Sequence, residues 1–290
     1  MQYGVEEVDL WDLGRQRLER RLRLTPRSSP TLKDILVSLG FSPDGRTLIT
    51  AALEQVQLRE LPGGAVRARL AGGREAVPLA GGRLLTLEPL PPWTGRPSPR
   101  GLRVWEQSTG RSLYTLPTDL CPSLEGSLPV AVSPDQRLLA FPPQGFGQEI
   151  EIWDVQERRR VARWKREKPV GFITLSFSPD GEQLAMGLGQ GQPLTLWSWR
   201  SSAPVRTLAE AGQPERLYWS TAGLLLGQEG RFRLLDPRSG TLLQTLRVDD
   251  AGSAPPGSMV LPLGASAMSA DRTTLAAQTR QGVRVWRAQG

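Results

Sequence analysis

A unit of four short apolar runs separated by tight turns recurs along the whole chain, and this repeat limits the fold more than any other feature. Its clearest copy is residues 173–208, where runs at 174–177, 183–187, 194–197 and 205–208 are separated by Ser178-Pro-Asp-Gly181 and other turn formers. Short runs rich in Leu, Ile, Thr, Phe and Trp and bounded by Gly and Pro indicate strands rather than helices. Four such strands predict one small antiparallel sheet that needs neighbours to cover its faces.

The second half of the unit, a strand, a turn and a further strand, occurs six times, and a seventh copy stops after its first strand. Aligned on the third strand, one position holds tryptophan in five copies, which are five of the nine tryptophans of the chain. The aligned residues are Trp11, Arg59, Trp105, Trp153, Trp197, Leu235 and Trp286. Their spacing of 38 to 51 residues matches the length of a four-stranded propeller blade. The sequence therefore predicts an all-β chain, a β-propeller of antiparallel blades.

The first two strands of the unit recur as well, around a Ser-Pro-Asp turn. The clear copies are Phe41-Ser-Pro-Asp-Gly45, Val132-Ser-Pro-Asp135 and Phe177-Ser-Pro-Asp-Gly181, and weaker copies lie at 79–87, 217–226 and 267–277. Pro presets φ at the first central position of a turn and Gly accepts a positive φ, so this pattern predicts a tight hairpin.

These residues resemble the WD-repeat family of β-propellers. Trp11-Asp12 and Trp153-Asp154 end predicted third strands, Leu235-Asp236 differs from that pair at one residue, and Phe-Ser-Pro-Asp-Gly is the turn that many bacterial members carry. The resemblance covers almost the whole chain and implies a propeller that acts as a scaffold for other proteins. The chain has no histidine, so the family's Trp–Ser/Thr–His–Asp network cannot form. We therefore expect apolar packing alone to hold the blades together.

The two ends of the chain leave the number of blades open. The chain opens on a predicted third and fourth strand (7–13 and 17–24) and stops after the third strand of its last unit. Seven blades with an incomplete first blade is the arrangement we favour. Six blades, with residues 17–24 completing the last sheet and a spare strand around Trp11, is the alternative. The repeat predicts a single domain over residues 1–290, or the C-terminal part of a longer propeller.

We expect a cytoplasmic protein. No apolar run approaches the roughly 20 residues of a membrane span, and the N-terminus lacks the basic and apolar segments of a signal peptide. The single cysteine, Cys121, cannot form an internal disulfide.

The longest predicted connections belong to one class, those joining strand two to strand three or one sheet to the next. They are 25–34, 88–101, 117–129, 142–149 and 249–262, whereas the turns within the two hairpins of each unit are short. Binding residues concentrate on variable loops held by a rigid scaffold. We therefore predict a partner-binding face at these connections, with candidate contact residues Trp93, Arg96, Arg100, Phe146 and Met259.

Basic residues cluster on two predicted fourth strands, and the net charge of the chain is +7. One cluster falls within 15–23; the other contains Arg158, Arg159, Arg160, Arg163, Lys165 and Arg166. A basic surface attracts phosphate backbones and acidic partners, so the second cluster is a candidate site for nucleic acid or another polyanion. The alternative is a purely structural role, in which an outer strand carries charge to avoid pairing with other chains.

Catalytic and cofactor motifs are absent from the sequence. Without histidine there is no Ser–His–Asp or Cys–His pair and no His-ligated zinc. We expect no cofactor and no metal, and a non-catalytic propeller that binds protein partners. A polyanion-binding propeller is the alternative function, and a hydrolase with paired carboxylates in the central channel is a weaker one.

Overall fold

The computed structural model covers residues 1–290 and describes most of them. The residues it does not describe are 1–6, 13–16, 24–35, 43, 53–54, 62, 72, 88–99, 121–129, 144–148, 166–172, 189–191, 202, 210–213, 229–230, 248–265, 269–271, 273, 280–281 and 288–290. The regular elements of the described part are β-strands, and they belong to two compact units, Met1–Ser127 and Leu128–Gly290.

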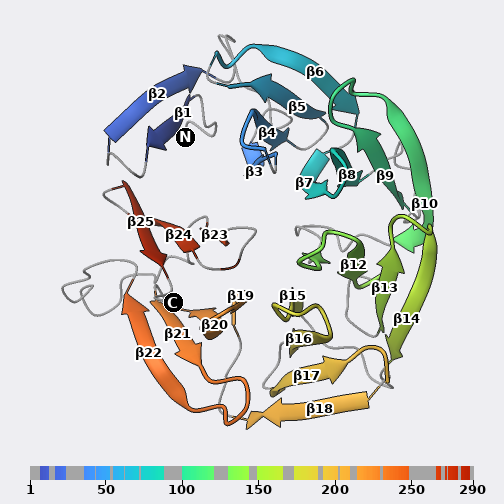
Figure 1. The fold of residues 1–290 in the computed structure, drawn as a ribbon, viewed down its shortest axis with the longest axis vertical. Helices are drawn as coiled ribbons and strands as arrows, with labels where there is room; N and C mark the ends of the chain where they lie inside the picture. The colour runs from blue at the N-terminus through green and yellow to red at the C-terminus, as the bar shows by residue number, and fades with distance from the viewer. Residues whose placement is uncertain are drawn as a thin grey trace, which may run out of the picture. The chain divides into compact units, whose positions relative to one another are not determined.

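The first unit contains a two-stranded sheet and two four-stranded antiparallel sheets, β3-β4-β5-β6 and β7-β8-β9-β10 (Figure 1). The first strands of the two larger sheets, β3 and β7, contact each other. The strands are β1 (Glu7–Asp12), β2 (Arg17–Arg23), β3 (Leu36–Phe41), β4 (Thr47–Ala52), β5 (Gln55–Glu60), β6 (Val66–Ala71), β7 (Gly73–Leu79), β8 (Arg83–Leu87), β9 (Arg100–Glu106) and β10 (Ser112–Leu120).

The second unit contains three four-stranded sheets and one three-stranded sheet, again in meander order. First strands of consecutive sheets again lie side by side, β11 with β15 and β15 with β19. The strands are β11 (Ala131–Val132), β12 (Leu138–Phe141), β13 (Glu149–Asp154), β14 (Arg159–Lys165), β15 (Ile173–Phe177), β16 (Gln183–Leu188), β17 (Leu194–Ser198), β18 (Ala203–Leu208), β19 (Arg216–Ser220), β20 (Gly223–Gln228), β21 (Arg231–Leu235), β22 (Leu242–Arg247), β23 (Ser266–Met268), β24 (Thr274–Thr279) and β25 (Gly282–Arg287).

The predicted strands and their order are confirmed, with differences at strand boundaries. Strand β9 begins at Arg100 and β13 at Glu149, so residues 100–101 and 149 belong to strands rather than to the predicted connections 88–101 and 142–149. Strand β10 runs to Leu120, so residues 117–120 belong to a strand rather than to the predicted connection 117–129. At the two ends, β1 and β2 form a sheet of their own and β23–β25 form a three-stranded sheet in the described part. The choice between six and seven blades stays a prediction.

The core lies between consecutive sheets, and the second strands show why. Side chains alternate between the two faces of a strand. On β16, Leu184 and Met186 pack against the preceding sheet, whereas Ala185 between them packs against the following one. On β20, Leu224 and Leu226 face the preceding sheet and Leu225 the following one. A strand covered on both faces reads as a continuous apolar run, which is what the sequence contains at these places.

The aligned position of the third strand is buried in every copy whose side chain the structure describes. Its residues are 7% exposed or less: Arg59, Trp105, Trp153, Trp197 and Leu235. In six sheets the pairing of the third with the fourth strand shifts register between this residue and the one before it. Such a β-bulge bends the strand and increases its twist, and the sequence pattern did not predict it.

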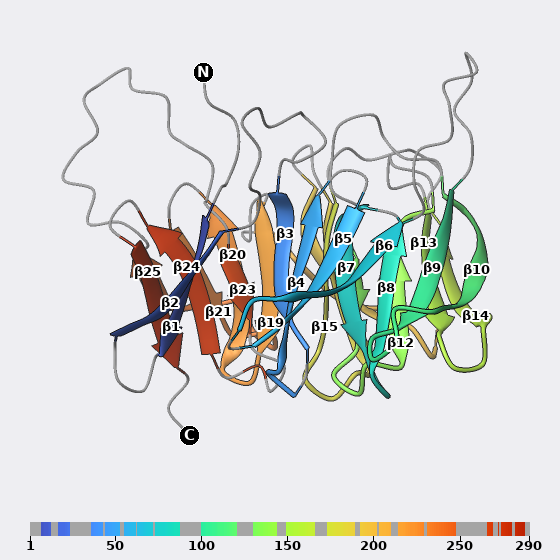
Figure 2. The same cartoon turned by 90° about the horizontal axis from the view of Figure 1, so that it is seen from above.

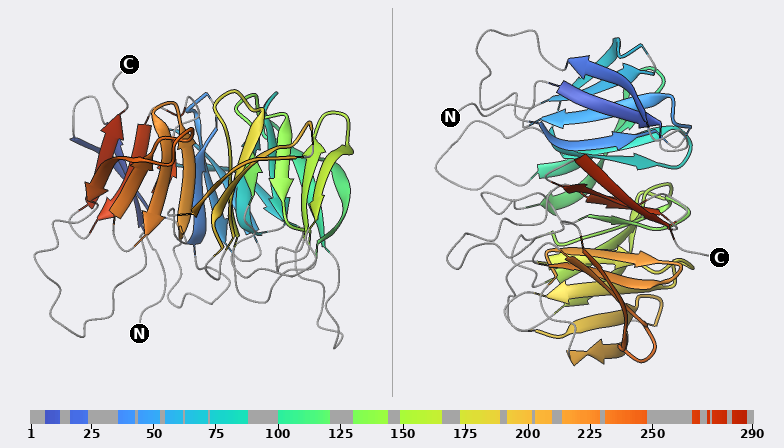
Figure 3. Two further views of the ribbon diagram at one scale, coloured as in Figure 1. Left: turned by 90° about the horizontal axis from the view of Figure 1, so that it is seen from below. Right: turned by 90° about the vertical axis from the view of Figure 1, so that its left-hand side faces the viewer.

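In each four-stranded sheet, the turn between the first and second strands and the turn between the third and fourth strands lie at the same end of the sheet, the turn edge (Figures 2 and 3). A backbone N–H just past the third strand donates to a carbonyl of the first turn: Leu61 to Arg46, Gln107 to Gly82 and Val155 to Arg137, at 2.8–3.0 Å. These bonds place both hairpin turns of one sheet beside each other. The predicted tight turns are confirmed where they are described, with a positive φ at Gly45, Gly64, Gly181 and Gly240.

The expectation that apolar packing alone holds the sheets together is wrong. The indole N–H of Trp105 donates to Thr86 Oγ1 across the sheet at 2.8 Å, and that of Trp153 donates to Glu151 Oε2 at 2.8 Å. Between sheets, the backbone N–H of Trp219 donates to Ser176 Oγ at 2.9 Å. Hydroxyl and carboxylate oxygens thus accept the indole N–H groups of Trp105 and Trp153, which have no histidine as a partner.

Candidate interaction surface

The three Ser-Pro-Asp turns are closed by the same pair of side chains. The Ser hydroxyl donates to the Asp carboxylate two residues later and accepts the backbone N–H five residues later. The same carboxylate accepts the backbone N–H of the residue two positions after the aspartate. The pairs are Ser42 with Asp44, Ser133 with Asp135, and Ser178 with Asp180. Four polar groups of each turn are thus satisfied within the turn, which fixes the turn edge.

In two of these turns the bonds favour the charged form of the carboxylate. The Ser42 hydroxyl is the largest cause that lowers the pKa of Asp44, and the Ser178 hydroxyl does the same for the pKa of Asp180. A hydrogen bond donated to a carboxylate stabilises the anion relative to the neutral acid. The turns that contain Asp44 and Asp180 therefore hold best when these two aspartates are ionised.

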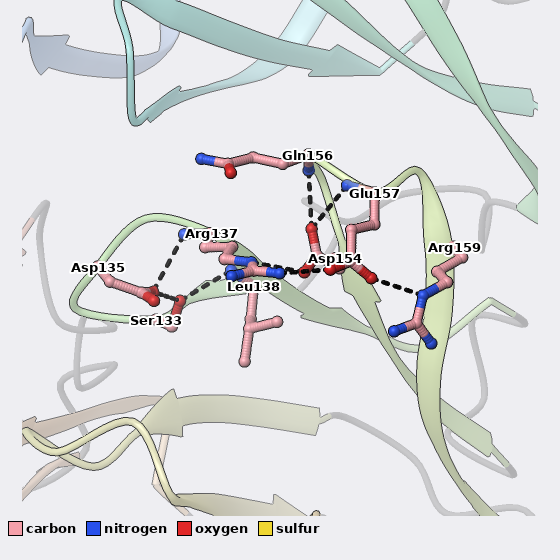
Figure 4. Close-up of polar contacts among 8 residues, drawn as sticks. All are labelled: Ser133, Asp135, Arg137, Leu138, Asp154, Gln156, Glu157 and Arg159. Atoms are coloured by element: carbon pink, nitrogen blue, oxygen red, sulfur yellow. Dashed lines mark hydrogen bonds and ion pairs between the residues drawn. The ribbon is translucent and has the colours of Figure 1, made fainter.

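The turn edge of the β11–β14 sheet carries an extended polar network (Figure 4). Its centre is Asp154, which follows Trp153 at the end of β13 and is 3% exposed. Oδ1 of Asp154 accepts the backbone N–H groups of Gln156 at 2.9 Å and Glu157 at 2.8 Å. Oδ2 accepts Nε of Arg137 at 2.6 Å. One buried carboxylate thus closes its own turn and binds the cation of the neighbouring turn.

The network continues toward solvent as a chain of ion pairs. Arg137 also contacts Glu157 at 2.6 Å, and Glu157 contacts Arg159 at 2.6 Å. The contact with Asp154 is the largest cause that raises the pKa of Arg137. The outer members are 41–64% exposed, and exposed pairs of this kind stabilise a protein only slightly. The chain nevertheless fixes the positions of two arginines at the surface.

The basic rim, defined as Arg158, Arg159, Arg160, Arg163, Lys165 and Arg166, lies on β14 and next to it, as predicted. Three of its cations contact carboxylates of the adjoining strand β13, and Arg159 contacts Glu157 of the turn. Arg160 contacts Glu151, and both Arg163 and Lys165 contact Glu149. Contact with Arg163 lowers the pKa of Glu149. Arg158 is exposed in the turn with a φ of 55°, and Arg166 lies outside the described residues. The rim is therefore a paired surface more than an array of free cations.

The partner-binding residues predicted at the long connections are not tested by the structure. Trp93, Arg96, Phe146 and Met259 lie outside the described residues. The backbone of Arg100 opens β9 and pairs with Leu120, but its side chain is not described. These five residues stay a prediction.

Sequence reasoning missed two arginines that the structure shows to be central to polar contacts. Arg137 follows a Ser-Pro-Asp turn and reaches Asp154, and Arg272 reaches three backbone carbonyls of other sheets. The Trp153-Asp154 pair is visible in the sequence, and its aspartate indicates that a cation such as Arg137 could lie at the facing turn. Nothing near Arg272 in the sequence indicates its contacts.

Within the described ranges no group of three or more His, Cys, Asp and Glu side chains is close enough together to hold a metal ion. No helix in that part of the chain is long and apolar enough to cross a membrane.

Comparisons with known proteins bear on the fold. No family model matches the chain, and no curated protein matches it. Among solved structures, the chain resembles one chain of a crystal structure of a mitotic checkpoint complex, with a TM-score of 0.71 and 16% sequence identity. The match covers 98% of this chain and 82% of the other. Together with the four-stranded meander sheets, this likeness shows that the chain has an all-β, propeller fold.

Proposed function

We propose that the protein is a cytoplasmic, non-catalytic, WD-repeat-like propeller that serves as a rigid scaffold for protein partners. The observation that carries the proposal is the unequal length of the connections at the two ends of its sheets. At the turn edge, no connection between described strands is longer than that from β21 to β22, residues 236–241. The long connections 24–35, 88–99, 121–130, 142–148, 166–172 and 248–265 all leave from the opposite ends of the strands, the long-connection edge.

The two edges differ in a way that suits binding. The short turns are closed by their own Ser, Asp and backbone groups, which leaves little freedom to shape a site there. A rigid framework that carries long variable segments is the usual arrangement of a protein-binding surface. Trp93, Phe146 and Met259 lie in those segments and supply the apolar contact groups that dominate binding energy at interfaces.

The structural likeness supports the same function. The similar chain is part of a mitotic checkpoint complex, in which it is assembled with other components. Fold alone does not fix function. The proposal for this chain therefore depends on its own long-connection edge.

Polyanion binding at the basic rim is the rival function. Four of the rim cations already contact carboxylates of Glu149, Glu151 and Glu157. A phosphate backbone would have to compete with these pairs, so the contacts favour the scaffold over the rival.

The test is a pull-down from native lysate with three baits: wild type, Trp93→Ala with Phe146→Ala, and Arg163→Gln with Lys165→Gln. Each bait is washed at low and high salt, with and without nuclease. The proposal expects a defined protein that survives high salt and nuclease and is lost only with the first double variant. Material released by salt or nuclease and lost with the rim variant would contradict it, because phosphate contacts are salt-sensitive.

A further inference from the structure

Arg272 occupies a turn position that disfavours its side chain. In sequence it follows Ser269-Ala-Asp271, in the place that Gly45, Gln136 and Gly181 take in the three Ser-Pro-Asp turns. All four residues have a positive φ: 69°, 57°, 75° and 59° for Arg272. Glycine adopts this conformation without strain, whereas a residue with a Cβ pays for it. The arginine at this position therefore has a conformational cost, and residues with strained backbone often occur at functional or structurally important sites.

The guanidinium of Arg272 contacts three other sheets of the 128–290 unit. Its Nη1 donates to the carbonyl oxygens of Phe177 at 2.5 Å and Trp219 at 3.0 Å, and its Nη2 donates to that of Val132 at 3.0 Å. In addition, the carbonyl of Arg272 accepts the N–H of Thr221 at 3.3 Å. Four contacts therefore join one residue to the sheets of β11, β15 and β19.

The three acceptors are equivalent residues of the repeat. Val132 and Phe177 are the last residues of the first strands β11 and β15, and Trp219 is the last residue but one of the first strand β19; each comes directly before a serine. Since first strands of consecutive sheets lie side by side, the repeat brings three carbonyl oxygens of the same kind toward one place. Three carbonyl dipoles make a site that favours a cation, and the planar guanidinium with its five N–H donors can bind several of them at once.

The site is partly removed from water. Burial lowers the pKa of Arg272. Within the part of the chain that the structure describes, no carboxylate forms an ion pair with it, so backbone oxygens provide the observed stabilisation. Hydrogen bonds from a charged donor are stronger than neutral ones, more so where water is excluded.

We propose that the carbonyl oxygens of Val132, Phe177 and Trp219 form an intramolecular guanidinium-binding site, and that Arg272 fills it to lock the turn of the β23–β25 sheet onto three preceding sheets. The chain thereby supplies its own cation where the repeat gathers carbonyl oxygens. The site fixes the turn edge of the unit by a single side chain.

The sign of one substitution tests this. If Arg272 were only a turn residue, Arg272→Gly would relieve the positive φ and stabilise the protein. The proposal expects the opposite, a decrease of about 5 °C in the melting temperature, because three hydrogen bonds from a cation are lost. The matched control is Gln136→Gly at the equivalent turn position, for which we expect an unchanged or higher melting temperature.

Hydrogen exchange locates the effect. In Arg272→Gly, exchange should rise in peptides covering 131–135, 175–180 and 217–222, and Gln136→Gly should leave 175–180 and 217–222 as in wild type. Arg272→Lys keeps the charge but not the planar fork, so it should give an intermediate increase even if the glycine variant does not fold. The proposal is overturned if Arg272→Gly melts at or above the wild-type temperature, or if Arg272→Lys exchanges like wild type at all three strand ends.

Discussion

Removal of the Asp154 carboxylate tests whether the turn network stabilises the scaffold. In Asp154→Ala, the N–H groups of Gln156 and Glu157 and the Nε of Arg137 all lose their acceptor. Asp154 is 3% exposed, so water replaces the carboxylate incompletely. The two backbone donors cost about 1 to 1.5 kcal/mol each when left without a partner, and the lost contact with the cation brings the total to about 3 kcal/mol.

Thermal unfolding followed by circular dichroism measures this cost. For a chain of this size about 3 kcal/mol corresponds to a decrease of about 6 °C in the melting temperature. Asp154→Asn keeps an oxygen for the backbone N–H groups and loses only the charge, so its decrease should be about 2 °C. The order wild type, Asn variant, Ala variant is the essential expectation.

The control is Asp236→Ala, the same turn position in the β19–β22 sheet. Asp236 accepts the N–H groups of Arg238 and Ser239, which lower its pKa, but the described contacts include no arginine of a facing turn. Its removal should cost less than that of Asp154. If Asp154→Ala melts within 1 °C or so of wild type, or no lower than Asp236→Ala, the reasoning about the buried carboxylate is refuted.

Three further substitutions give expected outcomes. The pKa of Asp180 in the folded protein lies below its ordinary value of 3.8. The ionised Asp180 therefore stabilises the folded protein at any pH above 3.8, and this stabilisation is lost as the pH falls through the lower, folded-state pKa. Ser178→Ala removes the largest cause, and its loss of stability on acidification, measured by urea unfolding, should be smaller than in wild type. Trp105→Phe should destabilise by about 1 kcal/mol more than Trp197→Phe, because only the Trp105 indole has a described acceptor; equal urea midpoints would contradict this. Glu149→Gln removes the partner of two rim cations and should raise heparin affinity and steepen its salt dependence, whereas unchanged retention on heparin would show that this pairing does not limit the rim.

The repeat was predictable because its causes are local. Apolar runs of strand length, Ser-Pro-Asp-Gly turns and the recurring tryptophan predict each hairpin from neighbouring residues alone, and the structure has those strands in that order. The continuous apolar run of β16 also indicates a strand covered on both faces, which Leu184, Ala185 and Met186 confirm.

The polar contacts were predicted less well because they join distant parts of the chain. Arg272 binds backbone carbonyls 53 to 140 residues away. Every residue has a backbone carbonyl, so the residue types in the sequence do not indicate which one accepts a hydrogen bond. The pairing of the basic rim could have been foreseen. Glu149 and Glu151 alternate on β13, and antiparallel pairing sets them against Lys165 and Arg163 of the next strand.

The most direct test of the proposed scaffold function is to determine which edge of the sheets a bound partner covers. Hydrogen exchange of the protein, free and bound to a partner captured from native lysate, measures it. The scaffold predicts protection in 88–99, 142–148 and 248–265, with the turns 155–158 and 236–241 unchanged. Protection confined to 159–165, and abolished by salt, would contradict the scaffold and make the basic rim the binding surface.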